Sequence, residues 1–339
     1  MITVDNVSKS YPSSQRGAPP VRALHNVSLE IGAGSLHGIV GTARSGKSTL
    51  AHCVALREQP DSGAVHLEGV HTADADTRRL RRLRRQIGFV DEHTELQHDR
   101  TVAGNVAAPL ERRGLEGMPR REHVGKLLDV VGLARGASRP PAELAQGQRI
   151  RLALAVSLAA NPSVLVADDP TAGLTAAETP AVLTVLDRVR AELGVTVLIT
   201  TGDSGVARRA CDSLSLLRDG TVVESGPVLG LLGDPGSRTA ELLLPAVETD
   251  HGQEARYERT VDVVLVGFAA VGALLPEAST RFDVELATIG GGVTRLGDTP
   301  VARFRVGVRG RQADAALTWI SERGAQVTRT VDDSYQLAA

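Results

Sequence analysis

The sequence predicts an α/β domain built on a parallel sheet, followed by a smaller α+β domain. Its 339 residues exceed the usual size of one domain. From Val4 onward, β-rich apolar runs alternate with helical patterns, which is typical of an α/β layer fold. Residues 248–259 are polar and lack periodicity, as expected for a linker. We therefore expect a first domain, a linker and a second domain over residues 1–245, 246–259 and 260–339.

The first domain is expected to contain strands buried on both faces. The runs that begin at Val164 and Val195 are continuously apolar, as in parallel strands covered by helices on both sides. Thr175 to Leu193, between them, has apolar residues at helical spacing. The clearest predicted strands are Leu36–Val40, Ile87–Val90, Val164–Ala167 and Val195–Thr200.

The second domain is expected to have the order strand, helix, strand, strand, helix, strand, which is the βαββαβ pattern of a ferredoxin-like fold. The glycine run Gly290–Gly292 predicts a bulge or kink in the second strand, or backbone that a ligand can approach closely. The six elements are expected over residues 261–266, about 270–282, 284–293, 301–308, 311–323 and 326–331.

Composition and charge exclude several classes of protein. Lys and Arg total 38 against 40 Asp and Glu, a formal charge of −2, which argues against disorder and a dedicated nucleic-acid-binding role. Cys53 and Cys211 form no CxxC pair, which suits a reducing compartment and supplies no zinc site. The longest apolar run, Val263–Leu275, is too short to cross a bilayer, and the first residues do not form a signal peptide. A cytoplasmic protein with at most a peripheral membrane role is expected.

One dense block of charge stands out, from Arg78 to Arg85. Leu80 and Leu83 lie one helical turn apart within it, so the block is interpreted as a helix with one apolar stripe and solvated arginines. Contact with RNA or anionic lipid is the alternative, although no aromatic residues are interleaved to stack on bases.

A phosphate-binding loop follows the predicted strand Leu36–Val40. Residues 41–49 read GTARSGKST, which is GxxxxGK[ST] between a strand and a helical run from Thr49 to Arg57. Glycines let backbone N–H groups converge on phosphate oxygens, Lys47 reaches the terminal phosphates and Ser48 offers a hydroxyl to Mg²⁺. The predicted nucleotide contacts are Gly41, Thr42, Ala43, Arg44, Ser45, Gly46, Lys47, Ser48 and Thr49.

A second motif ends the strand at Val164–Ala167 in two carboxylates. Asp168 is expected to hold Mg²⁺ through water, and Asp169 lies where a base could orient an attacking water molecule. An acidic strand end facing solvent is the alternative interpretation.

Together with Leu144–Gln148, these motifs resemble the nucleotide-binding subunit of an ABC transporter, and more narrowly the ATPase of bacterial methionine importers. The resemblance implies ATP and Mg²⁺ as cofactors, a homodimer or heterodimer with composite sites, and permease partners at the inner face of the cell membrane. It also implies that the C-terminal domain is a regulatory domain that binds methionine. The further matching stretches are 23–29, 84–88 and 100–106.

The same resemblance assigns further contacts. Tyr11 matches an aromatic residue that stacks on adenine, although a plain surface tyrosine is the alternative. The signature segment of one protomer reaches the γ-phosphate held by the other. In this sequence that segment contains Ala145, Gln146, Gly147 and Gln148.

Several positions depart from the family pattern, including the loop after Asp169, which ends in Thr175 where the family has an aspartate. Glu92 stands where the family has a glutamine that contacts Mg²⁺, and Asp169 where it has the catalytic glutamate. Ala145 and Gln146 replace the serine and first glycine of the signature, and Gly202 replaces a histidine. Phosphoryl transfer depends on positioning and electrostatics, so these changes predict impaired hydrolysis.

Two functions are favoured by the sequence, and a nucleotide-binding protein with a different soluble role is a third possibility. The first is an ATP-binding importer subunit for methionine or a related small molecule, with slow or nearly absent turnover. The second is an ATP-dependent dimeric scaffold or regulatory protein with little or no hydrolysis.

Overall fold

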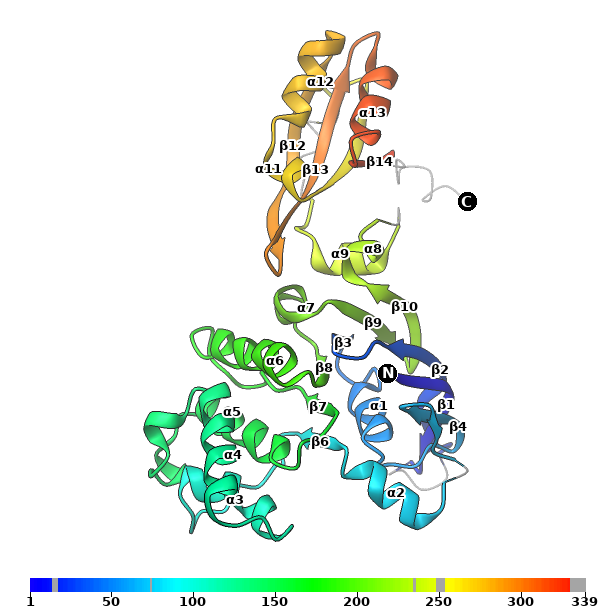
Figure 1. The fold of residues 1–339 in the computed structure, drawn as a ribbon. Helices are drawn as coiled ribbons and strands as arrows, with labels where there is room; N and C mark the ends of the chain where they lie inside the picture. The colour runs from blue at the N-terminus through cyan, green and yellow to red at the C-terminus, as the bar shows by residue number, and fades with distance from the viewer. Residues whose placement is uncertain (14–17, 74, 234–235, 248–253, 330–339) are drawn as a thin grey trace. The chain divides into compact units, whose positions relative to one another are not determined.

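The computed structural model describes residues 1–13, 18–73, 75–233, 236–247 and 254–329. It divides into two compact units, Met1–Val228 and Leu229–Ala339 (Figure 1). The domain boundary at residue 245 and the linker at 246–259 remain predictions, and residues 248–253 of that linker lie outside the described residues.

The first unit is built around a six-stranded sheet with the order β10-β9-β3-β8-β7-β6. The strands from β9 to β6 are parallel, and β10 runs antiparallel to β9 at one edge. In chain order they are β3 (Leu36–Val40), β6 (Ile87–Val90), β7 (Val164–Asp168), β8 (Thr196–Thr201), β9 (Ser213–Arg218) and β10 (Thr221–Pro227). The four predicted strands are therefore confirmed to within one residue at each end.

Strand β7 is buried on both faces, as its apolar sequence predicts. Val164 and Val166 belong to one hydrophobic core cluster, whereas Leu165 and Ala167 belong to another. Helix α1 (Lys47–Val54) packs in the first cluster, and α5 (Gln146–Leu158) and α6 (Thr179–Leu193) pack in the second. Each face of the sheet therefore has its own core.

A second, four-stranded antiparallel sheet covers the α1 side and was not predicted. Its order is β2-β1-β4-β5, and its residues share the core cluster of α1. The strands are β1 (Ile2–Tyr11), β2 (Val21–Ile31), β4 (Ser62–Leu67) and β5 (Val70–His71). The other helices of the first unit are α2 (Thr77–Arg84), α3 (Val102–Glu111), α4 (Gly117–Val130) and α7 (Ser204–Ala210).

Two predicted helices of this unit have different limits. Helix α6 begins at Thr179, not Thr175, because the Thr175 backbone N–H and hydroxyl donate to the Glu178 carboxylate in a turn before the helix. Helix α1 ends at Val54 rather than Arg57, because Leu56 adopts a left-handed conformation with a φ of 56°.

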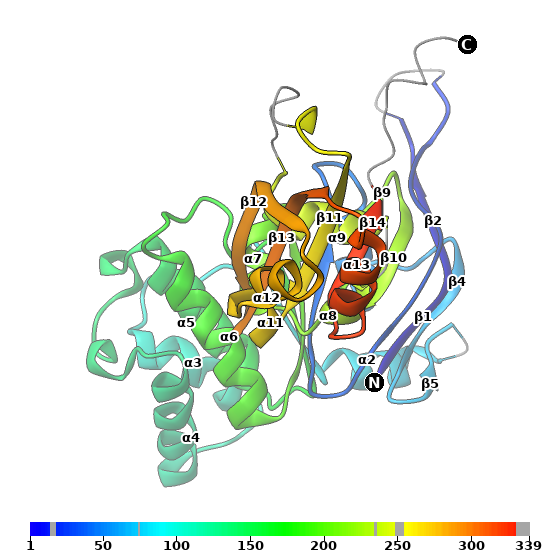
Figure 2. The same cartoon turned by 90° about the horizontal axis from the view of Figure 1, so that it is seen from above.

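The second unit contains a four-stranded antiparallel sheet with the order β12-β13-β11-β14. This is the ferredoxin-like order, so the predicted βαββαβ fold is confirmed. Helices α12 (Leu274–Phe282) and α13 (Ala313–Ser321) lie side by side on one face of this sheet (Figures 1 and 2). The strands are β11 (Arg259–Val266), β12 (Glu285–Leu296), β13 (Thr299–Arg309) and β14 (Gln326–Arg329), and the shorter helices are α8 (Val228–Leu231), α9 (Arg238–Leu243) and α11 (Phe268–Val271).

The helix predicted at 270–282 is two helices, α11 and α12, because Gly272 between them is extended, with φ −86° and ψ 179°. Residues 330 and 331 of the last predicted strand lie outside the described residues.

The glycine run in β12 forms the predicted bulge. The register against β13 shifts between Thr288 and Gly290. Gly291 has a φ of 97°, and a Cβ there would lie 2.0 Å from the Arg303 carbonyl oxygen. Glycine is therefore required because the neighbouring strand approaches its backbone.

Both cysteines are free and lie in the first unit. Cys53 is fully buried in α1, and burial raises the pKa of its thiol to about 12. Cys211 lies over β3, where a Cβ on Gly38 would come within 2.6 Å of its Sγ atom, and burial raises its pKa as well. Neither sulfur atom belongs to a metal-binding group among the described residues.

No helix in the described part of the chain is both long enough and apolar enough to cross a bilayer.

Candidate nucleotide-binding site

The phosphate loop connects β3 to α1, and two of its glycines are fixed by close contacts. A Cβ on Gly41 would lie 2.2 Å from the Leu217 carbonyl oxygen. Gly46 has a φ of 102°, and its Cβ would lie 2.4 Å from the Ala23 carbonyl oxygen. No other residue fits these two positions without moving the backbone of β2 or β9.

Lys47 lies at the start of α1 and folds its side chain back over the loop. Its Nζ donates to the carbonyl oxygens of Gly41 and Thr42, each at 2.8 Å. Partial burial lowers the pKa of the Lys47 ammonium, whereas the nearby carboxylates of Asp169 and Asp168 oppose that shift. The ammonium and the helix N-terminus together give this loop its positive potential.

Asp168 ends β7 beside the loop. Its Oδ1 atom accepts a hydrogen bond from the Ser48 hydroxyl at 3.1 Å and another from the Thr200 hydroxyl at 2.5 Å. A hydroxyl and a carboxylate side by side are the hard oxygen ligands that Mg²⁺ prefers, so this pair fits the predicted metal. In the described residues no three His, Cys, Asp or Glu side chains form a metal-binding group on their own. Phosphate oxygens and water would complete the coordination.

Asp169 is held in an uncommon backbone conformation next to this pair. Its φ is 48°, and its N–H donates to the Thr200 hydroxyl at 2.9 Å. Burial is the main cause of a raised pKa for its carboxyl group, and the charge of Asp168 adds to it. Asp203 and Glu92 raise this pKa further, while Lys47 lowers it. Asp169 therefore faces a cluster of acidic groups.

Gly202 follows β8 and leaves space in the same place. A Cβ on Gly202 would have only the Gly41 carbonyl oxygen within 4 Å among the described atoms, at 3.6 Å, which is ordinary van der Waals contact. Because β8 lies between β3 and β7, this loop borders both the phosphate loop and Asp168. A larger side chain could therefore be accommodated at residue 202.

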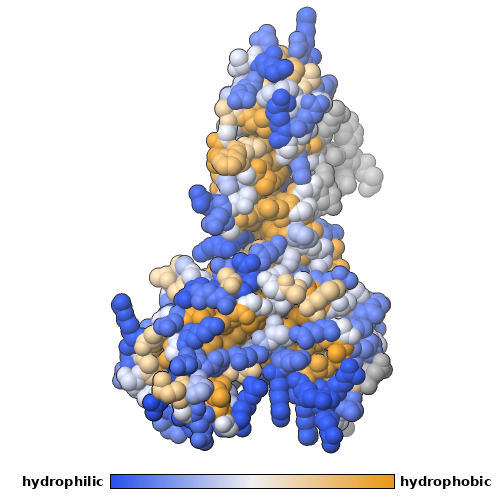
Figure 3. All heavy atoms as spheres, viewed as in Figure 1, coloured by the Kyte–Doolittle hydropathy of each residue, from blue (hydrophilic) through white to orange (hydrophobic). Residues whose placement is uncertain are grey.

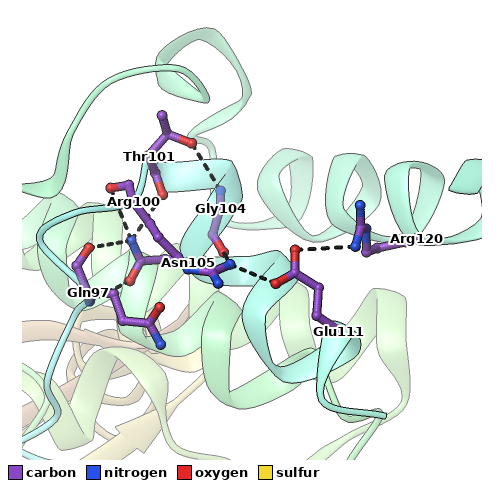
Figure 4. A network of polar contacts seen from close by, with 7 residues as sticks. All are labelled: Gln97, Arg100, Thr101, Gly104, Asn105, Glu111 and Arg120. Atoms are coloured by element: carbon purple, nitrogen blue, oxygen red, sulfur yellow. Dashed lines mark hydrogen bonds and ion pairs between the residues drawn. The ribbon is translucent and has the colours of Figure 1, made fainter. Parts of the chain in front are cut away.

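Glu92 lies in the loop after β6, and its side chain is 80% exposed, 3.4 Å from His93 Nε2. The buried amide of Asn105 fixes the far end of this loop to α3 (Figure 4). Asn105 accepts from the Gln97 N–H at 2.7 Å and donates to the carbonyl oxygens of Gln97 and Thr101 at 2.9 and 3.0 Å.

The signature segment begins α5. Gln148 Oε1 accepts from the Ala145 N–H at 3.0 Å, and Glu178 Oε1 accepts from the Gly147 N–H at 3.1 Å. Ala145 has no side-chain oxygen with which to cap the helix. Helix α5 packs in the core cluster on the opposite face of the sheet from α1. Gln146 and its neighbours are thus not joined to the phosphate loop of the same chain by any described contact.

Tyr11 ends β1 and pairs with Val21 on β2. Two residues farther along β2, the Ala23 carbonyl faces Gly46, so the end of β1 lies toward the phosphate loop. The Tyr11 ring is partly exposed, with Lys9 Nζ 5.6 Å from its centre.

Sequence reasoning missed three residues of this site. Thr200 bonds both Asp168 and the Asp169 backbone, Asp203 contributes to the raised pKa of Asp169, and Glu178 anchors the start of α5. The sequence could have indicated Thr200 and Asp203, because both are polar residues at or just after the end of an apolar predicted strand. Glu178 carried none, since its partner lies 31 residues away.

Comparisons with known proteins agree with this geometry. The ABC transporter family model matches residues 24–172, and the NIL domain model matches residues 259–329. A methionine import ATP-binding protein MetN of Myxococcus xanthus is 38% identical, with 96% of this chain and 97% of the relative covered. Its counterpart in Streptomyces griseus is 36% identical, with 100% and 95% covered.

A solved dimeric bacterial ABC transporter cassette has a TM-score of 0.60 and 33% identity, over 67% of this chain and 98% of that one. The post-hydrolysis state of such a dimer, with ADP and phosphate bound, has a TM-score of 0.59 over the same shares of the chains. The chain therefore belongs to the methionine import ATP-binding protein family, a branch of the ABC transporter ATPases that carries a C-terminal NIL domain.

Proposed function

We propose that this chain is the ATP-binding subunit of an importer for methionine or a related small molecule. Two copies, or one copy and a similar partner, would pair with integral-membrane permease subunits at the inner face of the cytoplasmic membrane. The observation that carries the proposal is the loop at residues 41–49 joined to Asp168 through Ser48, in a chain similar to importer ATPases along its whole length.

Within this proposal, Lys47 and the N–H groups of the loop bind the phosphates. Ser48 and Asp168 hold Mg²⁺, which when bound supplies positive charge to the phosphate oxygens. Tyr11 stacks on the adenine ring, and Glu92 approaches the metal side of the site. The segment Ala145–Gln148 covers the terminal phosphate held by the other protomer.

We further propose that hydrolysis is slow. A carboxylate at Asp169 lies about 1 Å short of the reach of a glutamate, and a displacement of that size can cost about 10²-fold in rate. The missing imidazole at Gly202 removes a donor to developing charge, and the loss of such a donor costs roughly 10²–10³-fold.

The alternative is an ATP-dependent dimeric scaffold or regulatory protein. The positions at which this chain departs from the family pattern favour this alternative. Asp169 and Gly202 belong to the catalytic side of a composite site, whereas Ala145 and Gln146 belong to the signature side. Pairing with an intact partner would therefore leave both sites altered.

ATP binding and hydrolysis measured on one purified sample test the proposal. Wild-type protein should bind Mg-ATP in titration calorimetry, and Lys47→Ala should abolish binding because the main cation of the loop is lost. Lys126→Ala, an exposed lysine of α4, is the control and should bind like the wild type. If Lys47→Ala bound Mg-ATP with the same affinity as the wild type, the nucleotide would bind at a different site.

The steady-state rate then separates the two functions. Turnover that rises when permease-containing membranes are added supports the importer. Binding without turnover under any of these conditions supports the scaffold.

A further inference from the structure

Helix α2 carries a surface charge that the nucleotide site does not explain. Of residues 78–85, six are arginines, and all six are exposed. Leu83 is the buried residue of the helix and joins the core cluster of α1 and the antiparallel sheet. The lower part of Figure 3, over α2, is correspondingly hydrophilic.

Four of the arginines share one face of the helix. At about 100° per residue, their side chains leave the helix within an arc of roughly 100°, opposite Leu80 and Leu83. This set, called here the arginine face, contains Arg78, Arg81, Arg82 and Arg85. Arg84 lies outside this set, and its Nε donates to the Leu56 carbonyl at 2.7 Å.

The charges of the arginine face are not neutralised within the described chain. No described carboxylate lies within ion-pair distance of any of the four guanidinium groups. Asp76 is the nearest acidic residue in sequence, and its carboxylate caps the helix by accepting from the Arg79 N–H at 2.6 Å. The helix is therefore held by its cap and its two leucines, while like charges repel at the i, i+3 and i, i+4 spacings.

We propose that the arginine face binds anionic phospholipid headgroups. Guanidinium groups bind phosphate oxygens in bidentate geometry and are weakly hydrated, so they suit a polyanionic surface. Each arginine near an anionic leaflet adds to this attraction. Four arginines on one helix form a charged patch that can bind such a surface without inserting apolar side chains.

The arginine face favours lipid over RNA because it has no aromatic side chains. None of its side chains is aromatic, so bases would have nothing to stack on. The choice of lipid also rests on the proposed function, since a permease partner would hold this subunit close to a membrane.

Vesicle sedimentation tests the proposal on the full-length protein. At about 0.1 M salt, where the Debye length is about 10 Å, wild type should bind vesicles rich in phosphatidylglycerol and not vesicles of phosphatidylcholine. Replacing all four arginines of the face by glutamine should weaken binding by at least tenfold. The matched control removes four exposed charges elsewhere in the same unit, by Arg112→Gln, Arg121→Gln, Lys126→Gln and Arg135→Gln, and should bind like the wild type.

Equal loss in both fourfold variants would overturn the proposal, because net charge alone would then explain binding. Tighter binding to single-stranded RNA than to anionic vesicles, lost in the arginine-face variant, would also overturn it and identify RNA as the occupant. Retained Mg-ATP binding in the arginine-face variant verifies that the variant is folded. Vesicle binding requires no permease, so failure of the importer proposal would leave this result standing.

Discussion

At the scale of single residues, the proposed site places the predicted nucleotide-binding residues next to two positions whose predicted catalytic roles depart from the family pattern. Lys47 donates to carbonyl oxygens of the loop, and the Ser48 hydroxyl donates to Asp168. Asp169 and Gly202 adjoin them, and both have lost side-chain atoms relative to the family pattern. Because there is space beside Gly202, the missing histidine can be reintroduced at this position and its effect measured.

We expect Asp169→Glu combined with Gly202→His to raise the steady-state rate of ATP hydrolysis by more than either change alone. A base and a charge-stabilising donor act as a unit, so their effects are not additive. The backbone at residue 202 has room for the Cβ of a histidine, which would meet only one described atom within 4 Å, at 3.6 Å. Gly202→Ala fills the same space without a donor and serves as the control.

Restoring the signature through Ala145→Ser and Gln146→Gly should add to the gain. A wild-type rate already within the usual enzymatic range of about 1–10³ s⁻¹ would refute the idea of an impaired site.

His37 predicts a pH dependence of stability. This residue of β3 is 1% exposed, and its ring lies between the hydroxyls of Ser213 and Ser215, at 2.8 and 2.9 Å. Burial lowers the pKa of its imidazole from 6.5 to about 4, so the folded protein holds the neutral form. Between these two values only the unfolded chain takes up the proton, and the free energy of unfolding falls as pH drops from 6.5 toward 4. The total loss from this group is about 3 kcal/mol.

Urea unfolding at pH 7 and pH 4.5 measures this effect. His37→Gln should shrink the difference between the two pH values, whereas exposed His98→Gln should leave it as in the wild type. An unchanged difference in His37→Gln would show that other groups cause the pH dependence.

At the scale of elements, the strands show which features a sequence can predict. Strand β7 was predicted to within one residue because an unbroken apolar run is a local signal. The antiparallel sheet was missed because β1 pairs with β2 through several bulges, and Asn6 and Asn26 adopt positive φ values that interrupt the alternation of side chains. Its pairing with β4 also joins residues some sixty positions apart, which no local pattern reveals.

In the site, too, local sequence motifs could be predicted and long-range contacts could not. The phosphate loop and Asp168 are contiguous motifs, so their chemistry was predictable. Thr200 reaches Asp168 because β8 lies between β3 and β7. The sequence of a single strand does not indicate which strands lie beside it, so this contact could not be predicted.

The bulge in β12 gives a prediction about one element. Gly291→Ala should lower the stability of the second unit by at least about 1–3 kcal/mol, because alanine is strained at a φ of 97° and its Cβ would clash with the Arg303 backbone. Gly292→Ala is the matched control, since its nearest described neighbours are side-chain atoms of Pro245 at 3.7 and 3.8 Å. Thermal unfolding of both variants decides the point, and equal melting temperatures would contradict the role given to Gly291.

At the scale of the whole molecule, the two units have separate hydrophobic cores. The core of the second unit draws all its buried residues from between Val261 and Ala325. A unit with its own core can fold alone, so we expect the fragment 258–339 to fold independently. Cooperative thermal unfolding of the fragment would verify this expectation.

We also predict that this fragment binds a small hydrophobic amino acid such as methionine as a regulatory signal. A dimerisation role without a ligand is the alternative. Calorimetry with methionine should release or absorb heat with the fragment and with the full chain, and methionine should change ATP affinity by the factor by which ATP changes methionine affinity. An absence of heat in both samples at millimolar methionine would contradict the sensor role and leave the fold unaffected.

The two free thiols of the first unit have a practical consequence for studying such coupling. The thiolate is the form of cysteine that reacts with maleimides and spin labels. Cys53 and Cys211 have raised pKa values, so at neutral pH both remain protonated and unreactive. A cysteine introduced at an exposed residue such as Val293 would then be the preferred target of labelling. A probe can thus be attached to the second unit without first removing the native cysteines of the chain.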